Sequence, residues 1–82
     1  MELKDTIEMM TSEDYKERLK AEYYQVRIRM DKLIDFLEKW DNGELSSIPD
    51  CPRAVFDGQL RGMSEYRMML LYQLNWEDIE YH

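Results

Sequence analysis

The chain has 82 residues, of which 11 are basic and 18 are acidic, and its formal net charge is −7. At this length a single core supplies only roughly 3–5 kcal/mol, and one cysteine and one histidine provide neither a disulfide nor a four-ligand zinc site. The acidic excess also argues against duplex nucleic acid and anionic membrane surfaces as partners. We therefore expect a soluble chain of the cytoplasm that gains stability by self-association, with no cofactor.

Leu3, Ile7 and Met10 predict a short leading helix over 1–10. A long helix is predicted over 12–40, with Thr11 or Ser12 as the N-cap. Apolar residues recur along it at alternating steps of three and four, which is a heptad pattern. These residues are Leu19, Tyr23, Val26, Met30, Leu33, Leu37 and Trp40. Gly43 suits the left-handed conformation that ends such a helix.

Residues 41–51 read as a loop, and Asp50 followed by Pro52 predicts the cap and first turn of a second helix over 52–75. Its apolar positions again recur at a spacing near 3.5: Phe56, Leu60, Met63, Tyr66, Leu70 and Leu74. Residues 76–82 show no helical stripe and are expected to end loosely. The fold class is therefore all-α, an antiparallel two-helix hairpin with a short N-terminal helix.

Both long helices carry more apolar side chains than one hairpin can bury. The first has Tyr24 and Ile28 opposite its heptad seam, with Ile34 and Phe36 beside the seam. The second has four such residues beyond its own seam: Met68, Met69, Leu71 and Tyr72. Packing by the N-terminal helix is one explanation. The other, which we favour, is a homo-oligomeric bundle that buries this surplus between subunits.

The second helix also carries a stripe of small residues, Ala54, Gly58 and Gly62, spaced by four. Such a stripe fits either close helix–helix packing or a ligand lying against the backbone. Arg67 occupies a seam position, where it predicts either a salt bridge to an acid of the first helix or an anion held in a subunit interface. The candidate ligand-binding residues are Arg67, Arg61, Tyr66, Gln59, Tyr23 and Gly62, with arginines for phosphate and aromatic rings for a base.

No constellation in the chain indicates catalysis. The single histidine is the terminal His82, and Cys51 has no histidine partner in the sequence pattern. Phosphate-binding glycine motifs are absent from the sequence as well. We therefore expect a protein that is not an enzyme and has no metal site.

The segment from Tyr23 to Leu74 resembles a family of small phage-encoded proteins of the crAss-phage type. The resemblance lies in RIRMDKLIDFLEK (27–39), in the proline before the second helix and in QLRGMSEYRMML (59–70). By architecture the chain is also similar to phage helical-hairpin sponge proteins, which oligomerise and sequester nucleotide immune signals of bacterial defence systems. That resemblance implies a phage anti-defence protein that captures a cyclic nucleotide or a cyclic ADP-ribose type of signal without cleaving it. The alternative is a non-catalytic phage protein that binds and blocks a host protein through its exposed Met and Tyr side chains.

Overall fold

A computed structural model describes residues 1–81, which form four helical elements. A 3-10 helix, η1 (Leu3–Thr6), leads into the single-turn α1 (Ile7–Met10), and the long helices α2 (Tyr15–Asp41) and α3 (Arg53–Trp76) follow. No strand occurs within residues 1–81, so the predicted all-α class is confirmed there. Among the described residues, no helix combines the length and the apolar character needed to cross a bilayer.

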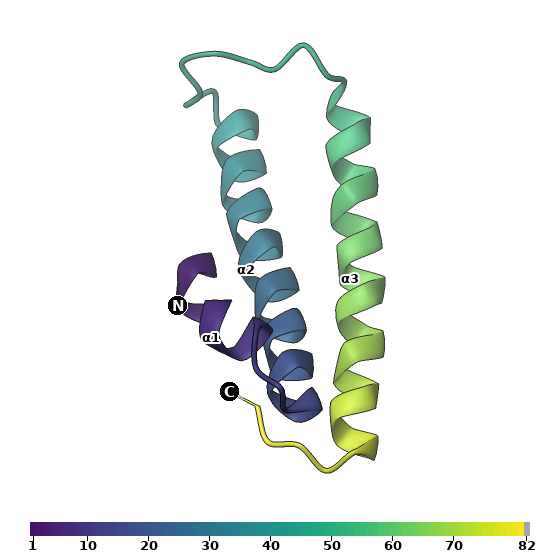
Figure 1. Ribbon diagram of the computed structural model, residues 1–82. Coiled ribbons are helices and arrows are strands. Elements are labelled where there is room, and N and C mark those ends of the chain that lie inside the picture. Colours follow the sequence, from purple (N-terminus) through teal and green to yellow (C-terminus); the bar gives the residue numbers. More distant parts are fainter. Residues whose placement is uncertain (82) are drawn as a thin grey trace.

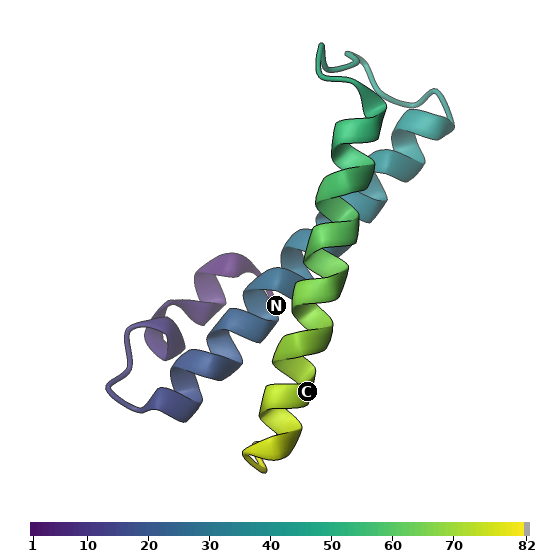
Figure 2. The same cartoon turned by 90° about the vertical axis from the view of Figure 1, so that its right-hand side faces the viewer.

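The elements are stacked side by side, with α2 in the middle (Figure 1). α1 lies against one side of α2, and α3 runs along the other side in the opposite direction. Turned by 90°, the view shows α3 crossing in front of α2 at an oblique angle (Figure 2). Among the described elements only α2 packs against α3, and the N-terminal segment covers α2 alone.

The N-terminus of α2 differs from the prediction. The helix begins at Tyr15 because Asp14 is its N-cap and accepts a hydrogen bond from the Lys16 amide at 3.0 Å. Thr11, one of the two predicted caps, instead closes the preceding turn by donating its hydroxyl to the Ile7 carbonyl. Ser12, the other, accepts from the Asp14 amide. An aspartate next to the helix competed successfully with both hydroxyls because its charge interacts better with the helix dipole.

α3 begins at Arg53, and its N-cap is Pro52, which makes no side-chain capping bond. The capping role predicted for Asp50 is therefore wrong. The side chain of Arg53 stabilises this end of α3 instead. It forms ion pairs with Asp41 at the end of α2 and with Asp57, which lies one turn further along α3. The hydrogen bond that the Arg53 guanidinium donates to Asp41 is the main cause of the raised pKa of Arg53.

Both long helices end in the same way, with a residue at positive φ followed by the two backbone bonds of a Schellman motif. Gly43, at φ 72°, ends α2, as its sequence position predicted. Asp78, at φ 54°, ends α3, and the Ile79 amide then bonds to the Leu74 carbonyl at 2.9 Å. This turn sends the C-terminal residues back toward α2 (Figure 1).

The core lies at the end of the α2–α3 pair that is remote from the connecting loop. Its buried members come from both helices and from the tail: Leu19, Tyr23, Val26, Met30, Leu70, Leu74 and Ile79. The ring of Tyr81 packs edge-on against Tyr23 at 5.2 Å between centroids. The expectation that 76–82 ends loosely is therefore wrong for residues 76–81, and His82 lies outside the described residues.

At the loop end aromatic rings of the two helices pack against one another. Phe36, Trp40 and Phe56 lie with centroids 5.7–5.9 Å apart in tilted and edge-on pairs. The guanidinium of Arg53 lies 5.8 Å from the ring centroid of Trp40. These contacts supply apolar burial together with a cation–π interaction, and they hold α3 close to the end of α2.

The surplus apolar face of α2 is covered within the chain. Ile28 is buried, and the fully buried Thr6 accepts a hydrogen bond from Gln25 of α2. Packing by the N-terminal segment therefore accounts for this half of the surplus. The corresponding face of α3 has no such cover, since Met68, Met69 and Tyr72 are about half exposed.

Candidate functional site

Arg67 is the polar residue most closely built into the α2–α3 packing. It lies one turn from Met63 and one turn from Leu71, and both of these pack against the core. The Nε atom of Arg67 is buried and has no hydrogen-bond partner in the part of the chain that the structure describes. A buried donor left without a partner costs about 1–3 kcal/mol, so its retention needs an explanation.

The predicted salt bridge from Arg67 to an acid of the first helix is not found among residues 1–81. Three other arginines, Arg27, Arg29 and Arg61, likewise form no ion pair or hydrogen bond with any described residue. By contrast, Arg53 is paired twice, and Arg18 donates to the Ser12 carbonyl at 2.8 Å. In a chain with 18 acids, four arginines without a carboxylate partner are available to an external anion.

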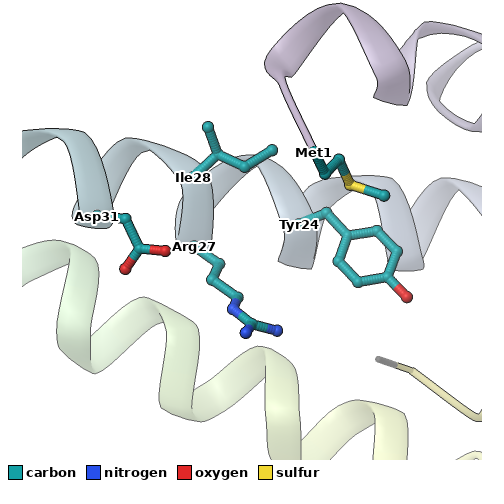
Figure 3. A pocket seen from close by; sticks show the side chains of 5 residues that line it. All are labelled: Met1, Tyr24, Arg27, Ile28 and Asp31. Atoms are coloured by element: carbon teal, nitrogen blue, oxygen red, sulfur yellow. The ribbon is translucent and has the colours of Figure 1, made fainter.

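A pocket of about 220 Å³ opens on α2 beside the N-terminus. Its walls are formed by Met1, Tyr24, Arg27, Ile28 and Asp31. Figure 3 shows the guanidinium of Arg27 extending from α2 toward the α3 ribbon, with Tyr24 and Asp31 on either side of it along the helix. The pocket thus combines an aromatic face with an unpaired guanidinium, which are groups that suit a base and a phosphate.

The size and charge of this pocket limit what one subunit can hold. Its volume lies below the roughly 300–1,000 Å³ typical of small-molecule sites. A neighbouring pocket of about 260 Å³ shares Met1, Ile28 and Asp31, and it extends toward Asp35, Lys32 and Glu2. Because the extension adds two acids, Glu2 and Asp35, against one lysine, the Arg27 end is the part better suited to an anion.

The six residues predicted to bind a ligand do not converge on one pocket of the subunit. Gln59, Gly62 and Tyr66 are spaced by three and four and share one flank of α3, where the Tyr66 hydroxyl bonds to the Glu22 carboxylate. Arg61 is exposed on the side of α3 that faces away from α2, whereas Arg67 is half-buried.

Tyr23 is 2% exposed inside the core, where it packs against the rings of Tyr24 and Tyr81. It therefore has no free ring face for a ligand in this fold. Arg27 was not predicted, because both candidate arginines, Arg61 and Arg67, were taken from the second helix. Its position three residues after Tyr24 was the signal that could have identified it.

None of the curated proteins and none of the solved structures compared with this chain matches it. A protein-family model described as Sequestin matches residues 13–72, which extends from the cap of α2 to near the end of α3. The matched region includes Arg27 and Arg67 and leaves out Met1 and the C-terminal tail. Because the model covers well over half of the sequence, the chain belongs to the Sequestin family.

Proposed function

We propose that this protein is a phage anti-defence protein that binds and sequesters a nucleotide-derived immune second messenger, of the cyclic nucleotide or cyclic ADP-ribose type, without cleaving it. The family name Sequestin describes a sequestering protein and supports the general activity. The nucleotide as ligand and the phage setting rest on the sequence resemblance and on the arginine chemistry.

The observation that carries the proposal is the buried Nε of Arg67, which has no hydrogen-bond partner among residues 1–81. A phosphate oxygen is the kind of acceptor that would satisfy it, because guanidinium–phosphate bonds are charge-assisted and often bidentate. Arg27 is a second guanidinium without a carboxylate partner, and it projects toward α3 (Figure 3).

Capture without chemistry agrees with the side chains that the sequence offers. Nucleophilic or general-base catalysis needs a positioned pair of groups, and the sequence contains one cysteine, Cys51, and one histidine, His82. The pocket beside Met1 is too small for a whole dinucleotide. We therefore assign binding to an oligomer of the helical hairpin, in which subunits enclose the ligand together.

Isothermal titration of the full chain against cyclic dinucleotides, cyclic oligonucleotides and cyclic ADP-ribose isomers tests the proposal. We expect one class to bind with a Kd below about 10 µM, which corresponds to roughly 7 kcal/mol. Heating the complex to denature the protein should release that compound chemically intact, as checked by mass spectrometry. A released product of different mass would show cleavage and contradict sequestration.

Arg67→Ala should weaken this binding about 10- to 150-fold, because a hydrogen bond to a charged group contributes roughly 1.5–3 kcal/mol. Arg29→Ala is the matched control, since Arg29 is an exposed arginine of α2 that also has no ion pair among the described residues. Its removal changes the net charge equally and should alter the Kd less than about threefold. Equal losses in the two variants would mean that the ligand responds to overall charge and not to Arg67.

A further inference from the structure

The face of α3 that points away from α2 is apolar and uncovered. Tyr72 lies two residues from both Leu70 and Leu74, which places it about 200° around the helix from these buried side chains. Met68 and Trp76 have the same relation to Leu70 and Leu74, and their exposed fractions are 48% and 88%. Figure 2 looks onto this side of the molecule and shows no other segment in front of α3.

The first half of the same face is formed by small residues. Ala54, Gly58 and Gly62 are all exposed, and a Cβ atom added at either glycine would meet no atom of the chain within 4 Å. Close packing against α2, which the sequence also allowed, is therefore not the reason for these glycines. A mid-helix glycine costs about 1 kcal/mol relative to alanine, so two on an open face point to a close approach from outside the subunit.

We propose that this face binds the same face of a second copy, with the two α3 helices antiparallel about a two-fold axis at Glu65. The large and small residues are placed symmetrically about that position. Gly62 and Met68 lie three residues to either side of Glu65, Gly58 and Tyr72 lie seven, and Ala54 and Trp76 lie eleven. The axis therefore sets each large side chain of one subunit against a small residue of its partner.

The charges on this face obey the same symmetry. Two Glu65 carboxylates meet near the axis, and an Arg61 guanidinium lies one helical turn away on each side. Arg61 has no ion pair within residues 1–81, so it is available to the Glu65 of the other copy. A different protein as occupant would require no such self-complementarity, which is the reason to assign a second copy.

The oligomeric state of the full chain without any ligand tests this interface independently of the proposed function. Sedimentation equilibrium over about 1–300 µM, which covers weak to moderate association, should show a monomer–dimer equilibrium. Arg61→Glu and Glu65→Arg should each weaken the dimer at least tenfold, because four like charges then surround the axis. The double variant restores two charges of each sign, and it should recover the dimer to within about threefold of the wild type.

Gly58→Leu provides a steric test that does not threaten folding. A Cβ atom at this exposed position meets no atom of its own subunit within 4 Å, and leucine improves helix propensity, so far-UV circular dichroism should be unchanged or stronger. In the dimer it fills the space for Tyr72 of the other copy, and association should weaken at least tenfold. Glu38→Leu, at an exposed site on α2, controls for the added leucine and should leave association unchanged.

A wild-type chain that stays monomeric throughout this range would overturn the inference and leave the face to another protein. If neither Gly58→Leu nor Arg61→Glu changed the dissociation constant of the dimer, the interface would lie elsewhere on the subunit. Failure of the double charge exchange to restore association would refute the antiparallel register centred on Glu65.

Discussion

Replacing Arg67 with methionine should stabilise the protein in the absence of ligand, although arginine is the natural residue. The buried Nε of Arg67 has no hydrogen-bond partner among the described residues, and removing such a donor recovers part of its desolvation penalty of about 1–3 kcal/mol. Methionine retains a flexible apolar stem of similar length, and its helix propensity is close to that of arginine. We therefore expect Arg67→Met to raise the free energy of unfolding by about 1–2 kcal/mol.

Urea denaturation followed by far-UV circular dichroism measures this change, with wild type and variant compared at the same protein concentration because association adds to apparent stability. In thermal scans the same gain corresponds to about 4–8 °C in Tm for each kcal/mol. Arg29→Met is the matched control, because it removes an exposed arginine from α2 and should change stability by less than about 0.5 kcal/mol.

Destabilisation of 1 kcal/mol or more in Arg67→Met would refute this reasoning. It would mean that the Arg67 guanidinium has a stabilising partner within the folded protein that methionine cannot replace. The salt bridge or hydrogen-bond explanation would then account for the residue, and its link to an anionic ligand would lose its basis. A stability gain accompanied by loss of ligand binding is the pattern expected of a residue kept for function.

Two further predictions concern the C-terminal tail and its attachment to α2. Ile79→Ala should lower the free energy of unfolding in urea by about 2–4 kcal/mol, because Ile79 is 7% exposed in the core. The control Ile48→Ala, in the exposed loop, should change it by less than about 0.5 kcal/mol. Similar small effects in both variants would show that the tail does not pack on the core. Tyr15 donates its hydroxyl to Glu77 at 2.9 Å, and chiefly this bond raises the pKa of Tyr15 above its ordinary value of 10.0. The stabilisation by this hydrogen bond is thus present below about pH 10 and is lost as the pH rises through the raised pKa of Tyr15. The difference in unfolding free energy between wild type and Tyr15→Phe should therefore shrink between about pH 9 and pH 12. A difference in urea melts that stays constant over this range would contradict the role given to the Tyr15–Glu77 bond.

Local patterns predicted the two long helices well, because helix formation and termination depend on neighbours in sequence. The three–four spacing from Leu19 onward placed α2 within a few residues at each end, and Gly43 marked its C-terminus. Caps were less predictable. Asp14 took the place of Thr11 or Ser12, and Asp50 does not cap α3, because several polar residues compete for a single position.

The tail and the candidate site could not be read in the same way. Ile79 reaches the core through a turn in which Asp78 adopts the left-handed conformation. Glycine is the usual residue at such a position, so neither a glycine nor a helical period in the sequence predicted the burial of Ile79. Arg27 belongs to a helix with balanced charge, and only its position beside Met1 and Tyr24 marks it as part of a pocket. The six candidate ligand-binding residues were predicted from their positions along the helices. Such positions alone do not determine which side chains meet in one pocket.

The sequence by itself determined the helical class, the extent of the long helices and the excess of apolar surface over what they can bury together. These properties follow from composition and from a 3.6-residue period, which act locally. Only the tertiary structure decided how that excess is distributed. The N-terminal segment covers the free face of α2, the tail completes the core, and the outer face of α3 stays open. Packing between distant segments sets these outcomes, because burial depends on which surfaces meet and not on the order of residues along one helix.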